Sequence, residues 1–476
     1  MQNYTITKIV ATLGPASCTK EKIRELLHAG VTMFRINSSH GDENFHKQNI
    51  SYIREIEKEE NTLIPVLLDL QGPKIRIGSL PAPIELKKGE VIKFRHQKEL
   101  SGGIIPVDYK GMADDVCIGE QILIDDGKIR LEVTDVQNGI IYAEIQTDGL
   151  LKQRKGINIP GSTGSIEVLT QRDLEFVDFA VKNEIDYLGL SFVREAGDVV
   201  KLREILASKN STARIISKIE KPQAVENIDE IIDVSDGIMV ARGDLGIEIN
   251  TEKVPIVQKT IIRKANQNRK AVIVATQMLE SMIENAIPTR AETSDVANAI
   301  LDGTDAIMLS GETAMGNYPV ESAGMMKKIA DEVEASRFLS RDKFPRQMIE
   351  AEQNSQAMAI GMSIADMTKK MDVKAVIALT GTGFTPISLS EGRLSAPIFA
   401  CCPNSKIRRA LKLYRGVYTL DLDFEPKIDT GALKTLNEFL IKEIGLVHGD
   451  TVIITGCLPN LLVGGTNFIK IHKIEA

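Results

Sequence analysis

The chain has 476 residues, of which 43% are hydrophobic, and a formal net charge of −7. This length exceeds what one hydrophobic core normally organises, so two or three globular domains are expected. Acidic and basic residues are interspersed, which argues against a nucleic-acid-binding surface, and no apolar stretch reaches the ~18 residues of a membrane span.

The five cysteines are odd in number and show no CxxC spacing. This argues against a disulfide framework and a zinc site, and it favours a reducing compartment. The N-terminus shows no basic-then-apolar targeting pattern. We therefore expect a soluble, cytoplasmic protein.

Eight short apolar runs, most of them followed by a helical pattern, predict eight buried parallel strands. The runs are 9–13, 33–36, 65–70, 187–192, 214–219, 237–241, 271–275 and 306–309. Eight such units predict a (β/α)8 TIM barrel, in an α/β fold, formed by residues 1–72 and 157–344. Polar residues gather at the C-terminal ends of the runs, where barrel enzymes carry their catalytic groups.

Two further domains are expected. Residues 73–156 have a strand-like period with tight-turn signals at Asp126-Gly127 and Asn138-Gly139, which predicts a small β-barrel domain inserted after the third barrel strand. Residues 345–476 return to alternating strands and helices, which predicts a C-terminal α/β domain with five strands.

Lys218 and Glu220 lie two residues apart at the end of one apolar run, and Asp244 follows the next run in a glycine-flanked turn. Because alternate side chains of a strand share a face, Lys218 and Glu220 should point the same way. An ammonium beside two carboxylates suits a divalent cation and an anionic substrate. Taken alone, the lysine–glutamate pair equally fits a solvated ion pair at a strand end.

Seven motifs, together with the domain order, resemble those of the pyruvate kinase family over essentially the whole chain. They are TKIVATLGP (7–15), RINSSHG (35–41), DLQGPKIR (69–76), SKIE (217–220), ARGDLG (241–246), ATQMLE (275–280) and GETA (311–314). The resemblance implies transfer of a phosphoryl group from phosphoenolpyruvate to ADP, giving pyruvate and ATP, with Mg²⁺ required. This reaction is the last step of glycolysis.

The resemblance also implies residue roles. Glu220 and Asp244 would hold Mg²⁺, Lys218 would neutralise the moving phosphoryl group, and Arg35 would bind phosphate. Thr276 would deliver a proton to the enolate. The positions implied to bind substrate are Arg35, Ser191, Lys218, Ala241, Arg242, Gly243, Asp244 and Thr276. On the nucleotide side the matching positions are Asn37, His40, Arg76, Lys155 and Asp126, and closure of the inserted domain would align ADP.

One departure concerns a monovalent cation. Members of the family often bind K⁺ through positions that match Asn37, Ser39 and Asp69, aided by a hydroxyl and a glutamate that this chain replaces with Leu70 and Lys74. The ammonium of Lys74 supplies the charge of the missing ion, so K⁺ should not be required. Ser38 stands where the family usually has phenylalanine, and this second departure should mainly affect packing.

The segment Thr380-Gly381-Thr382-Gly383-Phe384-Thr385 follows a predicted strand where the family binds phosphorylated effectors. Hydroxyls and free N–H groups before a helix can hold phosphate, so Thr380, Gly381, Thr382, Gly383 and Thr385 are the expected effector residues, although a simple turn fits equally. A homotetramer is implied by the resemblance. Two rival functions stay open, namely a Mg²⁺-dependent aldolase or lyase of pyruvate-like substrates and a binding paralogue without turnover.

Overall fold

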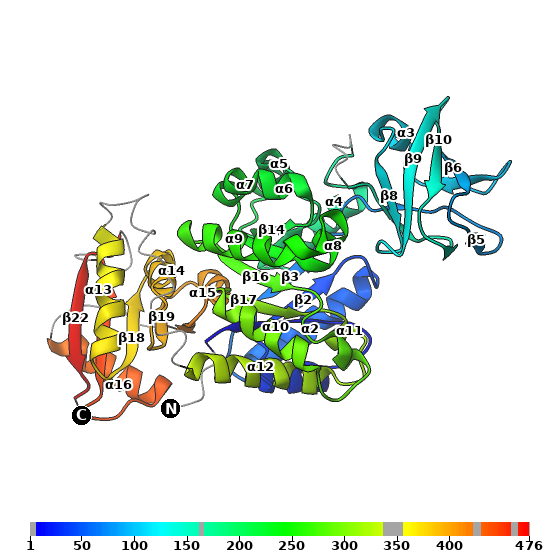
Figure 1. The fold of residues 1–476 in the computed structure, drawn as a ribbon. Coiled ribbons are helices and arrows are strands. Elements are labelled where there is room, and N and C mark those ends of the chain that lie inside the picture. The colour runs from blue at the N-terminus through cyan, green and yellow to red at the C-terminus, as the bar shows by residue number, and fades with distance from the viewer. Residues whose placement is uncertain (1–5, 161–165, 337–355, 422–429, 458–464, 476) are drawn as a thin grey trace.

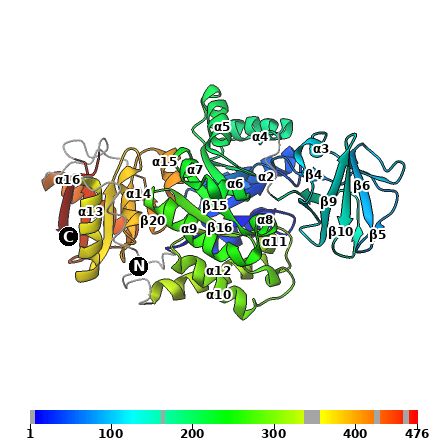
Figure 2. The same ribbon diagram turned by 45° about the horizontal axis from the view of Figure 1, so that its top comes forward.

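The computed structural model describes residues 6–160, 166–336, 356–421, 430–457 and 465–475. The chain forms three bodies in a row, with the inserted domain and the C-terminal domain at opposite ends of a central barrel (Figures 1 and 2). No helix among these residues is both long and apolar enough to cross a membrane.

The central body is a closed barrel of eight parallel strands, which confirms the predicted fold. All eight predicted runs form its strands, in the spatial order β1, β17, β16, β15, β14, β13, β3, β2. Their bounds are β1 Lys8–Thr12, β2 Met33–Asn37, β3 Val66–Asp69, β13 Tyr187–Leu190, β14 Arg214–Ile219, β15 Gly237–Ala241, β16 Ala271–Ala275 and β17 Ala306–Leu309.

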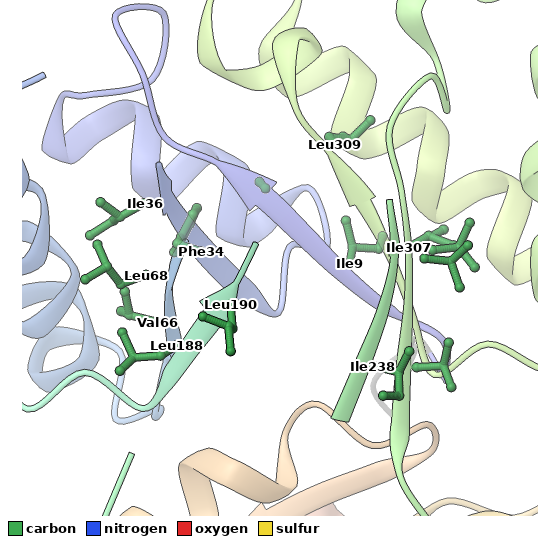
Figure 3. Packing of buried hydrophobic residues seen from close by; sticks show 14 of the residues in the cluster. Ile9, Phe34, Ile36, Val66, Leu68, Leu188, Leu190, Ile238, Ile307 and Leu309 are labelled. Atoms are coloured by element: carbon green, nitrogen blue, oxygen red, sulfur yellow. The ribbon is translucent and has the colours of Figure 1, made fainter. Parts of the chain in front are cut away.

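Helices surround this barrel and are fixed to it by alternate strand residues. Ile9, Phe34 and Leu68 point outward into one cluster with the helices, whereas Val10 and Met33 belong to a second cluster (Figure 3). The helices are α1 Lys20–His28, α2 Glu43–Glu59, α4 Gln171–Lys182, α5 Ala196–Ser208, α6 Pro222–Glu226, α7 Ile228–Val234, α8 Arg242–Glu248, α9 Val254–Gln267, α10 Arg290–Leu301, α11 Gly311–Ala314 and α12 Pro319–Ala335. Two 3₁₀ turns, Thr251–Lys253 and Glu280–Ile283, complete this body.

The start of α10 is fixed by two reciprocal hydrogen bonds. The side chain of Thr289 accepts a hydrogen bond from the N–H of Glu292, and the carboxylate of Glu292 accepts from the N–H of Thr289. This capping box satisfies two N–H groups that the helix leaves open. The same carboxylate binds Ser281, so the cap also fixes the loop after β16.

The inserted domain is a curled sheet of strands. Seven strands follow the order β4, β12, β8, β9, β10, β6, β7, and a bridge between Ile77 and Val107 joins the two ends. The bounds are β4 Ile75–Arg76, β5 Ile84–Leu86, β6 Val91–His96, β7 Ile104–Val107, β8 Gln121–Ile124, β9 Ile129–Gln137, β10 Ile140–Ile145, β11 Gly149–Leu151 and β12 Gly156–Asn158, with the short helix α3 Met112–Asp115. Because β12 reaches Asn158, the boundary predicted after residue 156 falls within a strand, and the domain limits stay predictions.

The C-terminal domain is a five-stranded mixed sheet between helices. Its order is β20, β19, β18, β21, β22, and only the edge strand β22 runs antiparallel to its neighbour in this described sheet. The elements are α13 Gln356–Lys370, β18 Val373–Leu379, α14 Phe384–Glu391, β19 Ile398–Cys401, α15 Ser405–Leu411, β20 Val417–Leu420, α16 Thr430–Ile444, β21 Thr451–Gly456 and β22 Phe468–Lys473.

This domain docks on the end of the barrel where the strands begin, opposite their C-terminal ends. The hydroxyl of Tyr187, at the start of β13, donates to the carbonyl of Ala410 at 2.5 Å, and Lys8 donates to the carbonyl of Val417 at 2.7 Å. The apolar interior of the barrel and the core of the C-terminal domain form one cluster. The C-terminal ends of the barrel strands therefore stay on the side of the inserted domain.

Candidate active site

Charged side chains converge at the C-terminal ends of β2, β3 and β14. Arg35 Nε donates to Asp69 Oδ2 at 2.9 Å, and its Nη2 contacts the same oxygen. Lys218 Nζ lies 3.3 Å from this oxygen and donates to Ser191 Oγ at 2.7 Å. Three strands thus bring Arg35, Asp69 and Lys218 together, as the barrel topology predicts.

Asp69 is the buried centre of this group. Burial alone would raise the pKa of its carboxyl group, but Lys218 and Arg35 outweigh burial and hold that pKa below its usual value. The absence of a side chain at Gly189 makes room for it, since a Cβ there would lie 2.7 Å from Asp69 Oδ1. Asp69 is therefore a carboxylate that holds two cations in place.

Lys218 Nζ also lies 2.8 Å from Glu220 Oε1. Burial lowers the pKa of Lys218, yet Asp69 and Glu220 more than compensate and raise it above its ordinary value. Burial raises the pKa of Glu220, Lys218 lowers it and Asp244 raises it, and the net result is a pKa of about 7. The Lys218 side chain is thus held as an ammonium, whereas the cations around Glu220 do not fully stabilise its carboxylate.

The two oxygens of the Glu220 carboxylate have different partners. Oε2 accepts a hydrogen bond from the N–H of Phe192 at 2.8 Å, and Phe192 has a left-handed φ of 56°. Oε1 is close to Lys218 but forms no aligned hydrogen bond among the described residues. A buried oxygen of this kind suits a cation, and its neighbour Asp244 supplies the second carboxylate.

Thr276 and Gly243 join the ends of β15 and β16. The N–H of Gly243 donates to Thr276 Oγ1 at 2.7 Å, and this hydroxyl donates to the carbonyl of Ala275 at 2.6 Å. Thr276 and Gln277 both have positive φ, 71° and 53°. Such values are uncommon for residues other than glycine and most unusual for a β-branched residue such as Thr276. Strain of this kind concentrates at functional positions because the surrounding structure must hold it.

Arg242 fixes this turn from outside. Its guanidinium donates to the carbonyl of Thr276 at 2.8 Å and to Asp295 of α10, also at 2.8 Å. The side chain of Arg242 is therefore used for structure, and a substrate contact would fall to its backbone. The sequence interpretation did not include Asp295, since nothing in its helix marks it apart from an ordinary surface acid.

Thr12 and Phe192 are further site residues outside the predicted set. Thr12 Oγ1 accepts from Arg35 Nη1 at 3.0 Å, and its position at the end of the first apolar run was a sequence signal for this. The role of the Phe192 N–H depends on its backbone conformation, which the sequence does not reveal.

Sequence and structure comparisons show which proteins this chain is similar to. The family "Pyruvate kinase, barrel domain" matches residues 4–323, and "Pyruvate kinase, alpha/beta domain" matches residues 358–472. The chain belongs to the pyruvate kinase family. A pyruvate kinase of Clostridium perfringens is 41% identical over 477 residues, with 98% of this chain and 99% of the relative covered.

Two other relatives of the family are similar to a comparable degree. A pyruvate kinase of Geobacillus stearothermophilus is 42% identical over 478 residues, covering 98% of this chain and 80% of the relative. The crystal structure of a pyruvate kinase from Cryptosporidium parvum superposes with a TM-score of 0.92 at 34% identity, covering 99% of this chain and 96% of that one. The barrel, the inserted domain and the C-terminal domain are thus the pyruvate kinase architecture.

The residues expected on the nucleotide side of this pyruvate kinase fold lie on two bodies. Asn37 is the last residue of β2 and His40 follows the strand, and Asn37 Oδ1 accepts from the N–H of Ser39 at 3.1 Å. Arg76 lies in β4, and its guanidinium donates to the carbonyl of Arg154 at 3.1 Å. The nucleotide-side positions are therefore divided between the barrel and the inserted domain.

Lys155 forms an ion pair with Asp125, at 2.8 Å. Asp125 and Asp126 both have positive φ in the turn between β8 and β9. The roles of Lys155 and Asp126 in nucleotide binding stay predictions.

The two departures from the family pattern lie beside the site. Ser38 is fully buried, and its hydroxyl donates to the carbonyl of Asp69 at 2.7 Å, so Ser38 does more than fill space. Lys74 follows β3 and packs its chain against Gly156 of the inserted domain, where a Cβ would lie 2.9 Å from its Cε. Its place in the monovalent-cation site stays a prediction.

The segment 380–385 forms a turn before α14. Thr380 Oγ1 accepts from the N–H of Gly383 at 2.9 Å, and Gly383 has a φ of 90°. Thr385 is buried within the helix and its hydroxyl accepts from Thr466 at 2.8 Å. Among the five expected effector residues, Thr385 is thus engaged inside the domain, whereas Gly381 and Thr382 lie on the turn itself.

Proposed function

We propose that this chain transfers the phosphoryl group of phosphoenolpyruvate to ADP, giving pyruvate and ATP. One observation carries this proposal: Lys218 is buried between Asp69 and Glu220, and Oε1 of Glu220 is buried without an aligned hydrogen bond among the described residues. An anionic substrate, a divalent cation and a fixed ammonium are what phosphoryl transfer requires.

Glu220 and Asp244 would hold the Mg²⁺ ion. Oε1 of Glu220 is buried without an aligned hydrogen bond among the described residues, and the pKa of this group is raised to about 7. Both features fit a carboxylate whose charge a metal ion completes. The described residues contain no group of three or more ligating side chains, which agrees with an ion that keeps most of its coordination for water and substrate. When bound, Mg²⁺ would act as a Lewis acid that neutralises charge on the phosphoryl and enolate oxygens.

The chain's own residues would then act on the transferring group. An oxygen of the ADP β-phosphate forms the new P–O bond while the bond between phosphorus and the enol oxygen breaks. Lys218, held by Asp69 and Ser191, would neutralise the phosphoryl charge in flight, and Arg35 would orient the phosphate. Since both cations are fixed before the substrate arrives, little reorganisation is needed.

Protonation of the enolate at its methylene carbon would complete the reaction. Thr276 is proposed to deliver this proton. Its hydroxyl is held by Gly243 and Ala275, next to the backbone N–H groups that are proposed to bind the substrate carboxylate. Backbone N–H groups around Arg242, Gly243 and Asp244 are proposed to bind the substrate carboxylate, and Gly243 would share its N–H with Thr276. Ser191 and Ala241 complete the proposed substrate contacts.

Further properties of the enzyme belong to this proposal. Asn37, His40, Arg76, Lys155 and Asp126 would bind the nucleotide as the inserted domain closes. Turnover would not require K⁺. The turn 380–383 would take a phosphorylated activator, and the protein would act in the cytoplasm as a homotetramer.

The test is ATP formation from phosphoenolpyruvate and ADP, with and without Mg²⁺, using folded protein and a panel of phosphorylated activators. Turnover that needs both ADP and Mg²⁺ is expected. Release of pyruvate without ADP would favour a lyase, and the absence of any turnover would favour a non-catalytic paralogue.

A further inference from the structure

Glu248, the last residue of α8, joins three separate segments of the chain through one oxygen atom. Its Oε1 accepts a hydrogen bond from Lys221 Nζ at 2.6 Å and another from Asn158 Nδ2 at 2.8 Å. The Glu248 side chain is fully buried. The three residues come from α8, from the segment after β14 and from β12 of the inserted domain, and none of them belongs to the proposed substrate or metal contacts.

Two of these segments carry the proposed Mg²⁺ ligands. Lys221 directly follows Glu220, and α8 carries Asp244 in its first turn. The ammonium of Lys221 also lies 5.8 Å from the ring centre of Phe192, whose N–H binds Glu220. The contact between Lys221 and Glu248 therefore closes a loop of contacts around the two carboxylates and limits how far apart they can move.

The third segment moves with the inserted domain. β12 pairs with β8 and with β4, so Asn158 is built into the sheet of that domain. A cavity of about 70 Å³ lies at this junction and is lined by Asn158, Lys221 and Phe192, among other residues. Empty space at a junction leaves room for one body to shift against the other.

The buried charge of Glu248 depends on these two donors. Its other oxygen, Oε2, has no hydrogen-bond partner among the described residues. A buried carboxylate that loses a partner is strongly destabilised, so a shift of Asn158 or Lys221 must be followed by Glu248. Through α8 and Lys221, such a shift reaches Asp244 and Glu220.

We propose that Glu248, with Lys221 and Asn158, is a positioning residue that links the placement of the inserted domain to the spacing of the divalent-cation ligands Glu220 and Asp244. The inference rests on the proposed metal site and deepens it. Closure of the inserted domain over the nucleotide then stabilises the geometry that binds the cation, and bound cation favours the closed arrangement.

Mn²⁺ binding to the full-length protein, measured by electron paramagnetic resonance of the free ion, tests this without any turnover. Glu248→Gln and Lys221→Met change the local charge in opposite directions. If Glu248 and Lys221 acted only through their charge, Lys221→Met would tighten Mn²⁺ binding and Glu248→Gln would weaken it. A positioning role predicts that both weaken it, by about fivefold or more, and that Lys221→Arg restores most of the affinity.

Asn158→Ala leaves both charges in place and isolates the link to the inserted domain. Faster hydrogen–deuterium exchange of the backbone amides at 156–158, with about twofold weaker Mn²⁺ binding, is expected for this variant. Glu226→Gln, an exposed carboxylate in α6, is the matched control and should change neither measurement. If Lys221→Met does not fold, Lys221→Gln replaces it; this variant keeps a donor to Glu248 but loses the charge, so a positioning role predicts near-wild-type affinity, whereas a pure charge effect predicts tighter binding.

Opposite shifts for Glu248→Gln and Lys221→Met, or wild-type affinity in both, would overturn the positioning role. Glu220→Gln and Asp244→Asn separate this failure from that of the metal site. Loss of Mn²⁺ binding in both ligand variants would support the metal site even if the positioning role fails. Retained binding would reject the metal site itself.

Discussion

Nζ of Lys218 lies 2.8 Å from Oε1 of Glu220, although Lys218 is within β14 and Glu220 follows its last residue. The strand alternation places both side chains on the interior of the barrel mouth. The charges of Asp69 and Glu220 outweigh the burial of the ammonium and hold the pKa of Lys218 above its ordinary value. The pair is therefore a fixed positive charge beside an incompletely neutralised carboxylate.

Replacement of that charge is the most direct test of the proposed chemistry. Lys218→Met should lower kcat by about 10²- to 10³-fold with a much smaller change in the KM for phosphoenolpyruvate, because the ammonium acts mainly on charge that develops during transfer. Asp69 and Glu220 would each lose a cationic partner, at a cost of about 3–5 kcal/mol of folding free energy. Thermal melting must therefore accompany the kinetics.

Lys201→Met is the control for this variant, since Lys201 is an exposed lysine of α5 paired with Glu167. It should behave as wild type in both measurements. A folded Lys218→Met enzyme with kcat within about threefold of wild type would contradict the catalytic role of the ammonium.

Thr276→Val should separate proton transfer from phosphoryl transfer. The substitution keeps the shape of the side chain but removes the hydroxyl that Gly243 and Ala275 hold, so exchange of the pyruvate methyl protons in D₂O should slow by about 10²-fold or more. Nuclear magnetic resonance of pyruvate with the enzyme measures this exchange. Thr276→Ser keeps the hydroxyl and should retain most of the rate, and equal exchange rates in the valine and serine variants would show that the hydroxyl is not needed.

The fold was predictable because its signals are local. Each barrel strand is a short apolar run, and the antiparallel strands β8, β9 and β10 of the inserted sheet are joined by turns whose Asp-Gly and Asn-Gly pairs are visible in the sequence. Arg35, Asp69 and Lys218 could be placed together because the carboxyl ends of parallel strands meet at one end of a barrel.

The contacts that were not predicted depend on conformation or on distant segments. The N–H of Phe192 reaches Glu220 only because Phe192 adopts a positive φ, and its residue type does not favour one. Glu248 meets Asn158, 90 residues earlier, after two domains have been arranged. No periodicity or spacing carries such information.

Independence from K⁺ is a prediction that one charge reversal tests. Lys74→Glu removes the ammonium proposed to replace the ion, so activity in K⁺-free buffer should fall by about tenfold or more, and added K⁺ should restore it. Initial rates with K⁺ and with an organic cation give the comparison. Wild-type enzyme that itself loses most of its rate in the organic cation would contradict the role of Lys74, as would a variant indifferent to K⁺.

Lys8 should make the stability of the protein depend on pH. Burial, with repulsion from Lys412 and Arg415, lowers the pKa of Lys8 from 10.5 to about 7, and Glu334 only partly opposes this. Between these pH values the unfolded chain binds more protons at this lysine than the folded chain does, so its contribution to the free energy of unfolding rises from pH 7 towards pH 10. The ammonium also lies at the contact with the C-terminal domain, 2.7 Å from the carbonyl of Val417.

Lys8→Met removes this titration and keeps an apolar chain of similar length. The gain in melting temperature from pH 7.5 to pH 9.5 should therefore be smaller in the variant than in wild type, by about 1–2 °C. Differential scanning fluorimetry at both pH values measures it, with Lys58→Met, an exposed position of α2, as the control. Burial of Lys412 lowers its pKa to about 8 and adds a titration of the same sign, so part of the gain should persist in the variant. An identical gain in wild type and Lys8→Met would mean that Lys8 is charged in the folded protein at pH 7.5 and pH 9.5, and that its contact with Val417 is an ordinary charged hydrogen bond.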